Sequence, residues 1–336
     1  MVLIFLSAIR AACDSLRAMS DLTKDSTCAP TGSTANPRIV SGHAIASDGV
    51  EIYWRAVGQG PWIACCNGVG VSTFFWKYVT TQFSDRYTVI VWDYRGHGRS
   101  QRTLDPANTD MTIERHADDL RAVLKAIADA EGLDAPRPAV VLGHSMGCQV
   151  ALETRRRSPE MVHGLVLMLG TAGKTLSTFF DWSHSPKLFH AAHKALFRAG
   201  PRANDFLRPL LESPLAFSFA TTFSLVDPYY TRSEDFVPYL EHLATLDFRL
   251  FIENVCRTND HDAWDLLPQL ERPLLVIAAE NDKFTPMWCS EKIVSDTPGA
   301  ELMVLADASH AALIEQPSTI NHRLERFIRE RAGVSW

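Results

Sequence analysis

Short apolar runs alternate with amphipathic helical patterns along most of this chain. The runs show no period-two alternation of apolar and polar residues, which is typical of strands that are covered on both faces, as in a parallel sheet. They occupy residues 62–66, 87–92, 139–142, 165–169, 274–279 and 300–305. Because strands alternate with helices, the pattern predicts an α/β fold with a mostly parallel, doubly wound sheet.

The clearest helical pattern has apolar residues at spacings of four, three, four and three, with Thr112 in its N-terminal cap region. These residues are Ile113, Ala117, Leu120, Leu124 and Ile127. Weaker patterns predict further helices at residues 73–83, 146–157, 287–295 and 314–331. Two alternating segments, 38–44 and 50–57, flank the turn sequence Ser47-Asp48-Gly49 and predict an antiparallel pair of edge strands.

Residues 171–270 show no clear strand pattern, although aromatic residues are dense there. A stretch of this length cannot be a structureless loop in a compact protein, so we predict a helical lid inserted over one edge of the sheet. The insertion divides an α/β core that comprises residues 37–170 and 271–336. Most of the aromatic side chains are expected to pack the lid on the sheet, and the alternative is that they line an apolar acyl pocket. They are Phe179, Phe180, Trp182, Phe189, Phe197, Phe206, Phe217, Phe219, Phe223, Tyr229, Tyr230, Phe236 and Tyr239.

Residues 1–36 are predicted to be a flexible N-terminal extension. No Lys or Arg precedes the apolar run at 2–9, and Arg10 interrupts the run, so it does not match a secretory signal. The seven cysteines include the adjacent pair Cys65-Cys66 and no C-x-x-C pair. We therefore expect reduced thiols in a cytoplasmic protein. No apolar run approaches the roughly 20 residues that a membrane-spanning helix needs.

Composition narrows the possible functions only a little. Hydrophobic residues make up 46% and charged residues 21% of the chain, which is ordinary for a globular protein and excludes a disordered or fibrous one. The net charge is −6, from 33 Lys and Arg against 39 Asp and Glu. A chain without a basic excess is not expected to bind nucleic acid.

The pentapeptide Gly143-His144-Ser145-Met146-Gly147 lies between an apolar run and a helical pattern. This is the G-x-S-x-G motif in the strand-turn-helix context in which the serine becomes exposed on a strained turn. We therefore predict that Ser145 is a nucleophile and that the N–H of Met146, at the start of the helix, stabilises an oxyanion. His144 is expected to pack away from the nucleophile.

With these features the sequence resembles the α/β-hydrolase fold family, in particular its members with a helical lid, over about residues 38–331. A second motif carries the resemblance: residues 93–100 match the family's D-x-R-G-x-G-x-S turn. The resemblance implies that Asp93 and Arg95 order the surrounding loops. His97 lies within this structural turn and is therefore not expected to be the catalytic base.

A serine hydroxyl needs a base, and a carboxylate orients that base. In the family these residues follow one another along the chain in the order serine, acid, histidine. Asp282 matches the acid in a D-x-x-x-P loop after the run at 274–279, and Glu280 is the second candidate. His310 matches the base, with Glu315 and Pro317 downstream as in the family's histidine loop.

The resemblance also implies a second oxyanion donor, the backbone N–H of Val69. Family members commonly have His-Gly where this chain has Asn67-Gly68, and Asn67 is expected to hold the loop through its amide. The resemblance implies no cofactor. The sequence has no H-x-x-x-H or H-E-x-x-H pair on a clear helix, so it does not predict a metal site.

These features predict a serine hydrolase that cleaves a small-molecule carboxylic ester, with an apolar acyl group, through an acyl-enzyme. The same arrangement in this family can hydrolyse C–C bonds, amides or thioesters, or support cofactor-free peroxidase chemistry. Haloalkane dehalogenases and epoxide hydrolases would have Asp in place of Ser145. A noncatalytic binding protein is the remaining alternative. The oligomeric state stays open.

Overall fold

The computed structural model describes residues 37–333 except 214–215, 217, 219–225 and 228. The predicted N-terminal extension, with Cys13 and Cys28, lies outside the described residues. The described cysteines, which are Cys65, Cys66, Cys148, Cys256 and Cys289, are buried free thiols. Within the described ranges, no helix has both the length and the apolar character that crossing a membrane requires.

The described strands form one sheet in the order β1-β2-β4-β3-β5-β6-β7-β8, and all pairs beyond β2 and β4 are parallel. The predicted α/β fold with a mostly parallel, doubly wound sheet is therefore confirmed. The strands are β1 (Ile39–Ile45), β2 (Glu51–Val57), β3 (Trp62–Cys66), β4 (Thr88–Trp92), β5 (Ala139–His144), β6 (Val162–Met168), β7 (Leu274–Ala279) and β8 (Glu301–Leu305).

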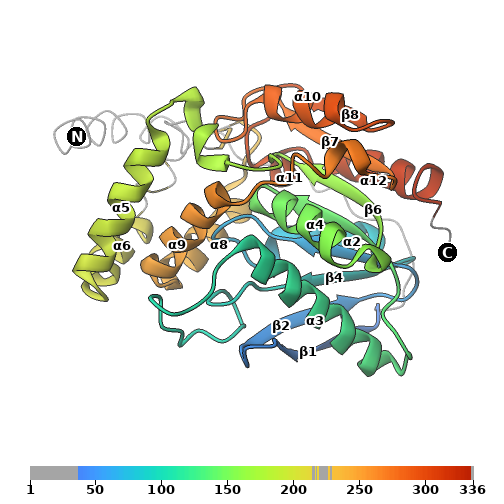
Figure 1. Ribbon diagram of the computed structural model, residues 1–336, viewed down its shortest axis with the longest axis horizontal. Coiled ribbons are helices and arrows are strands. Elements are labelled where there is room, and N and C mark those ends of the chain that lie inside the picture. Colours follow the sequence, from blue (N-terminus) through green and yellow to red (C-terminus); the bar gives the residue numbers. More distant parts are fainter. Residues whose placement is uncertain (1–36, 214–215, 217, 219–225, 228, 334–336) are drawn as a thin grey trace, which may run out of the picture.

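Helices cover both faces of the sheet (Figure 1). On β3, Trp62, Ala64 and Cys66 belong to the cluster beneath one layer of helices, while Ile63 and Cys65 belong to the cluster on the other face. This double burial is the reason that the strands read as unbroken apolar runs. The first layer contains α3 (Ile113–Glu131), α4 (Met146–Arg157) and α10 (Met287–Asp296), and the second contains α2 (Lys77–Phe83) and α12 (Pro317–Glu330).

Local signals determine where these helices begin and end. Thr112 caps α3 by accepting a hydrogen bond from the N–H of Arg115 at 3.2 Å, as its position predicts. The single helix predicted at 314–331 is instead two, α11 (Ala312–Glu315) and α12. Pro317 is the cause, because proline disfavours helical backbone at the preceding residue, and Gln316 has φ −128° and ψ 51°. The predicted helix at 73–83 likewise begins as a 3₁₀ helix, η1 (Thr73–Trp76), before α2.

The residues between β6 and β7 (169–273, the β6–β7 segment) contain helices that gather at one end of the sheet, on the left in Figure 1. Apart from a bridge between Gly173 and Asp262, its described residues form helices, turns and loops. The longer helices are α5 (Ser185–Ala199), α6 (Arg202–Leu211), α8 (Ser233–Thr245) and α9 (Phe248–Asp260), with the short helices η3 (Thr175–Ser177), η4 (Phe179–Asp181) and η5 (Leu267–Gln269).

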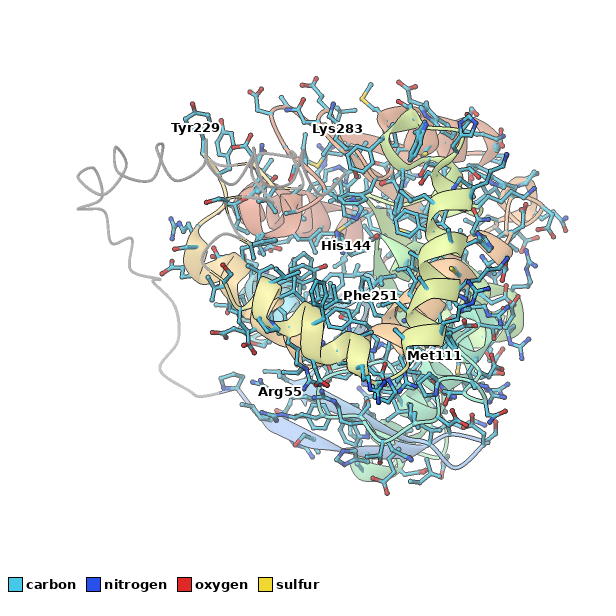
Figure 2. All side chains as sticks on the ribbon, turned by 90° about the vertical axis from the view of Figure 1, so that its left-hand side faces the viewer. Arg55, Met111, His144, Tyr229, Phe251 and Lys283 are labelled. Atoms are coloured by element: carbon cyan, nitrogen blue, oxygen red, sulfur yellow. The ribbon has the colours of Figure 1, made fainter. Side chains whose placement is uncertain are left out.

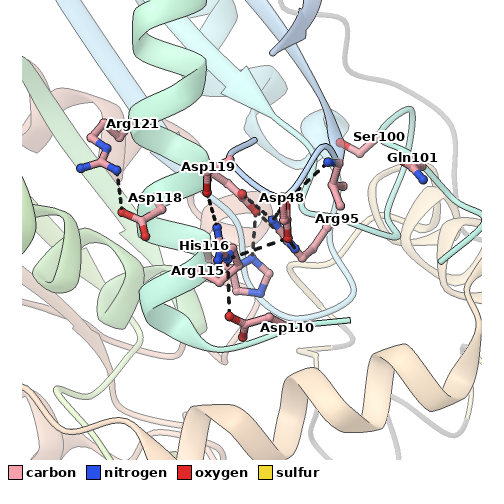
Figure 3. Close-up of polar contacts among 12 residues, drawn as sticks. Asp48, Arg95, Ser100, Gln101, Asp110, Arg115, His116, Asp118, Asp119 and Arg121 are labelled. Atoms are coloured by element: carbon pink, nitrogen blue, oxygen red, sulfur yellow. Dashed lines mark hydrogen bonds and ion pairs between the residues drawn. The ribbon is translucent and has the colours of Figure 1, made fainter. Parts of the chain in front are cut away.

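A buried ion pair lies beneath the turn that follows β4 (Figure 3). Arg95 donates to both carboxylate oxygens of Asp119 on α3, at 2.8 and 2.6 Å, and neither side chain is exposed. Arg95 also donates to Asp48 in the β1–β2 turn at 2.7 Å. One turn earlier on α3, His116 donates from Nε2 to Oδ1 of Asn254 on α9 at 2.9 Å. The network joins the edge hairpin, the core and the β6–β7 segment.

Acidification is expected to destabilise the fold through His116. Burial, together with the charge of Arg95, lowers the pKa of His116 from 6.5 to about 3. As the pH falls below about 6.5, the unfolded chain therefore binds a proton that the folded protein excludes, and the free energy of unfolding declines towards about pH 3. We expect this decline, measured by urea unfolding, to be steeper by about 1 kcal/mol per pH unit than in His116→Gln, whose amide can still donate to Asn254. Parallel declines would contradict a buried neutral histidine.

Candidate active site

Ser145 occupies a strained turn between β5 and α4. Its backbone has φ 56° and ψ −121°, and its N–H donates to the carbonyl of Met168 at 3.0 Å. Glycines make this turn possible: a Cβ at Gly143 would overlap the carbonyl of Gly147, and a Cβ at Gly147 would overlap the carbonyl of Cys66. The motif therefore forms the sharp turn that its spacing predicts, with Ser145 partly exposed at the carboxyl end of the sheet.

The structure brings together the three residues that were predicted to act with one another. Nε2 of His310 lies 2.9 Å from Oγ of Ser145, and Nδ1 of His310 lies 2.8 Å from Oδ2 of Asp282. Because an ionised carboxylate only accepts hydrogen bonds, Nδ1 of His310 carries the proton and donates a hydrogen bond to Asp282. Nε2 is then the acceptor for the hydroxyl of Ser145.

Asp282 is held firmly on its own loop. Its Oδ1 accepts the N–H groups of Phe284 and Thr285 at 2.8 and 2.9 Å, and its Oδ2 accepts the hydroxyl of Thr285 at 2.8 Å. The side chain is buried, whereas Glu280, the second candidate for the acid, is exposed. Asp282 is therefore the carboxylate that faces His310.

The loop that carries His310 is fixed by several neighbouring groups. The carboxylate of Glu315 accepts the N–H of Ser309 at 2.8 Å and its hydroxyl at 2.6 Å. The same carboxylate accepts the N–H of Asp227 at 2.8 Å and the hydroxyl of Thr231 at 3.0 Å, both in the β6–β7 segment. Glu315 thus links the histidine loop to that segment.

Val69 and Met146, the two predicted oxyanion donors, line the same cavity as Ser145. Met146 is the first residue of α4, and the N–H groups of a first helical turn have no partner within the helix. Val69 belongs to the loop after β3 (residues 67–72, the β3 loop). The positive end of the helix dipole adds to the attraction for an anion at this point.

Asn67 explains how the β3 loop is held without the histidine that is common in the family. The side chain is fully buried. Its amide donates to the carbonyl of Trp92 at 2.7 Å and accepts the indole N–H of Trp76 at 2.7 Å. The hydroxyl of Tyr94 donates to the backbone carbonyl of Asn67 at 2.8 Å. The amide therefore holds the loop, as the sequence predicts.

The D-x-R turn is structural. Asp93 accepts hydrogen bonds from the hydroxyl of Ser72 at 2.5 Å and from the N–H of Arg99 at 2.9 Å, so it ties this turn to the β3 loop. His97 is buried, and its Nδ1 donates to the carbonyl of Arg95 at 3.0 Å. Burial holds the pKa of His97 below its ordinary value. His97 does not line the cavity beside Ser145, in agreement with the prediction that it is not the base.

A cavity of about 270 Å³ lies beside Ser145 and His310. Of the aromatic residues noted in the sequence, those that line it are Phe179, Phe189, Phe236 and Tyr239. Those that are exposed instead are Phe180, Trp182, Phe206, Tyr229 and Tyr230. Phe197 packs against Leu176, Ile252 and Val255, and Phe217, Phe219 and Phe223 lie outside the described residues. The described aromatic residues are therefore divided between the cavity, the interior of the β6–β7 segment and the surface.

One wall of the cavity was not predicted from the sequence. Phe251, Val255 and Thr258 line it from one face of α9, at spacings of four and three residues. Figure 2 shows this end of the molecule, with His144 and Phe251 near the centre of the view and the exposed Tyr229 towards its edge. The helical spacing was visible in the sequence, but nothing in it tells which face of α9 covers a cavity.

The expectation that His144 packs away from the nucleophile is wrong. Its ring lines the cavity, 5.2 Å from the ring of His310 and 4.9 Å from that of Phe75. Its Nε2 lies 3.1 Å from the backbone carbonyl of His310. The backbone at the turn directs residue 144 towards the histidine loop, a long-range contact that the local motif does not reveal.

The chain is similar to members of one protein family over most of its length. The model of the alpha/beta hydrolase family matches residues 63–323. A protein of Agrobacterium fabrum named "Putative carbamate hydrolase RutD" is 25% identical over 282 residues, which are 83% of this chain and 97% of that protein. A protein of the same name from Pseudomonas syringae is 28% identical over 268 residues, 80% and 93% of the two chains.

Solved structures share the fold. An esterase from Exiguobacterium antarcticum aligns with a TM-score of 0.65 at 19% identity, covering 86% of this chain and 99% of that chain. The enol-lactonase from Burkholderia xenovorans aligns with a TM-score of 0.68 at 20% identity, covering 86% and 100%. At this identity the likeness concerns the fold alone. Among the described residues, no group of three or more His, Cys, Asp or Glu side chains is arranged to hold a metal ion.

Proposed function

Because the chain belongs to the alpha/beta hydrolase family, we propose that it is a serine hydrolase that cleaves carboxylic esters with an apolar acyl group. The observation that carries this proposal is the chain of contacts from Ser145 through His310 to Asp282, at 2.9 and 2.8 Å, beside an apolar cavity. A serine hydroxyl is a weak nucleophile at neutral pH, and this geometry supplies both its base and the group that orients the base.

In the first half of the reaction, Nε2 of His310 removes the hydroxyl proton while Oγ of Ser145 attacks the ester carbonyl carbon. Asp282 stabilises the imidazolium that forms. The N–H groups of Met146 and Val69 donate to the carbonyl oxygen as it becomes an oxyanion, and losing one such donor costs about 3 kcal/mol of transition-state stabilisation. The tetrahedral intermediate then expels the alcohol, which takes the proton from His310.

In the second half, water replaces the alcohol. His310 removes a proton from the water as its oxygen attacks the acyl-enzyme on Ser145, and the same N–H groups hold the second oxyanion. Collapse of this intermediate releases the carboxylic acid and returns the proton to Ser145. No cofactor enters these steps.

We further propose that residues 171–270 act as a lid over a core formed by residues 37–170 and 271–336. Side chains of the β6–β7 segment supply one wall of the cavity, while Ser145, Asp282 and His310 come from the strand ends. The wall residues are Thr175, Phe179, Phe189, Val226, Phe236, Tyr239, Phe251, Val255 and Thr258. Such a wall would bind an apolar chain.

The lining of the cavity supports ester hydrolysis over carbamate hydrolysis as the proposed function. The relatives' name supports carbamates as a second candidate substrate class, since the same nucleophile can attack a carbamate carbonyl. However, the described residues that line the cavity include no Lys, Arg, Asp or Glu, and most are aliphatic or aromatic. A cavity of about 270 Å³ with this lining suits an acyl chain of several carbons.

A series of p-nitrophenyl esters tests this proposal. We expect kcat/KM to rise by at least about tenfold from acetate to hexanoate, because each methylene buried in the cavity contributes up to about 0.8 kcal/mol. Val255→Phe should shift the preference to shorter chains, because the larger side chain fills part of the cavity.

Matched aryl carbamates, thioesters, anilides and β-diketones are measured beside the esters. Activity confined to acetate would contradict the apolar acyl pocket. Faster turnover of a carbamate or another class than of every ester would contradict the assignment as an ester hydrolase.

A further inference from the structure

His144 contacts three separate parts of the site. It is joined to Ser145 by a peptide bond. Its Nε2 lies 3.1 Å from the backbone carbonyl of His310. On the other side of the ring, Nδ1 faces Gly68 of the β3 loop, where an added Cβ would lie 2.9 Å from Nδ1 and 3.3 Å from Cβ of Ser145. The imidazole therefore lies between the histidine loop and the loop that carries Val69.

The contact with His310 defines how the ring of His144 is protonated. A carbonyl oxygen only accepts hydrogen bonds, so Nε2 of His144 is the donor and Nδ1 has a lone pair. Within the described part of the chain, that buried Nδ1 has no hydrogen-bond partner. An unpartnered polar atom in a buried site lowers stability, so packing alone would favour an apolar ring here. The Nε2 donor is the feature that only a polar side chain can supply.

The surroundings keep His144 neutral. Its side chain is buried, and burial, with a contribution from the nearby ring of His310, lowers its pKa to about 3. The other charged group that acts on it is Asp282, which favours the protonated form but does not offset the burial. A neutral donor at this place does not oppose the positive charge that His310 acquires during the reaction.

We propose that His144 is a positioning residue that holds the backbone of His310 and the β3 loop at a fixed separation from Ser145. This inference rests on the proposed function as a serine hydrolase. The ring of His310 is held at its two nitrogens by Ser145 and Asp282, but those contacts fix only the ring. Glu315 holds the neighbouring Ser309, and the hydrogen bond from His144 adds a contact to the carbonyl of His310 itself. Misplacing that backbone would lengthen the distance from Nε2 to Oγ of Ser145 and slow the proton transfer.

Two amide variants of His144 separate positioning from packing. In His144→Gln the amide nitrogen reaches the place of Nε2, whereas in His144→Asn it reaches only that of Nδ1. His144→Phe retains the ring shape without a donor and provides a second loss variant if the Asn variant does not fold. The readout is the rate of covalent labelling by a fluorophosphonate probe, resolved into its maximal rate and its half-saturating concentration.

We expect His144→Gln to label within about threefold of wild type, while His144→Asn and His144→Phe lose at least about tenfold in maximal rate, the effect of one hydrogen bond. The half-saturating concentration should change less than the maximal rate, because the other residues that line the cavity are unchanged. Equal rates in all three variants, or a Gln variant as slow as the folded Phe variant, would overturn the proposal.

A proton NMR measurement tests the positioning without any turnover. The downfield resonance of the Nδ1 proton of His310, assigned by its loss in His310→Ala, reports the hydrogen bond to Asp282. It should persist in His144→Gln and shift upfield or broaden in His144→Asn and His144→Phe; an unchanged resonance in all variants would refute the role. Failure of the wild type to label would instead refute the serine hydrolase and leave the NMR result to decide the role of His144.

Discussion

Replacing Ser145 with alanine is expected to lower kcat for p-nitrophenyl hexanoate by about 10⁶-fold, with KM changed by less than about threefold. Alanine cannot form the acyl-enzyme, and the cavity that binds the acyl chain remains. The N–H groups of Met146 and Val69 would still stabilise an oxyanion, so a small residual rate above that of water is expected. The measurement is steady-state hydrolysis by purified protein with matched thermal stability.

The partners of Ser145 provide the controls for this experiment. His310→Ala should lower kcat by about as much as Ser145→Ala does. The double variant should be no slower than either single variant, because the residues act as a unit. Asp282→Asn should lower kcat by about 10⁴-fold, because the amide of the new side chain no longer keeps the proton on Nδ1 of His310. A fluorophosphonate should label the wild type on Ser145 and not label Ser145→Ala. Wild-type ester turnover in Ser145→Ala would disprove the mechanism.

Replacing Arg95 with methionine is expected to lower the free energy of unfolding by about 3–5 kcal/mol. Arg95 and Asp119 are both fully buried, and the pair is joined by two hydrogen bonds of 2.8 and 2.6 Å. Without the guanidinium, the carboxylate of Asp119 must remain buried without its counter-ion or take up a proton. Burial alone already raises the pKa of this carboxyl group, so its neutral form will become populated. Urea unfolding monitored by tryptophan fluorescence measures the loss.

Asp118, the residue before Asp119 on α3, is a matched control for this prediction. Asp118 pairs with Arg157 at 2.8 Å near the surface, where the arginine side chain is 39% exposed. Asp118→Asn should therefore cost no more than about 1 kcal/mol. The double variant Arg95→Met with Asp119→Leu should recover much of the loss, since it leaves no unpaired buried charge. Equal effects of Arg95→Met and Asp118→Asn would show that burial does not govern the pair.

The local sequence was sufficient to predict the nucleophile. The glycines around Ser145 permit the strained turn, which lies between a strand and a helix. Asp282 and His310 were predicted from the resemblance to the α/β-hydrolase fold family, whose order of catalytic residues and loop motifs they match. The departure at Asn67 was also interpreted correctly, because an amide has both a donor and an acceptor with which to hold a loop.

Contacts between remote segments could not be obtained in this way. His144 was predicted to pack away from the nucleophile, yet its ring contacts a loop that is 166 residues away along the chain. Phe251 was not singled out, although it lines the cavity, while the more conspicuous Phe206 and Tyr229 are exposed. The partners of Arg95 were likewise invisible, because Asp48, Asp119 and the turn after β4 meet only when the sheet and α3 are assembled.

The sequence by itself determined the alternation of strands and helices and the turn at Ser145, and its resemblance to the α/β-hydrolase fold family indicated the loops that carry Asp282 and His310. The first two features depend on backbone rules that operate over a few residues, such as apolar periodicity and the φ angles open to glycine. The tertiary structure alone decided which aromatic side chains line the cavity, what His144 donates to and which carboxylate neutralises Arg95. Each of these depends on the packing of segments far apart in the chain, where volume and hydrogen-bond geometry select one partner among many of similar composition.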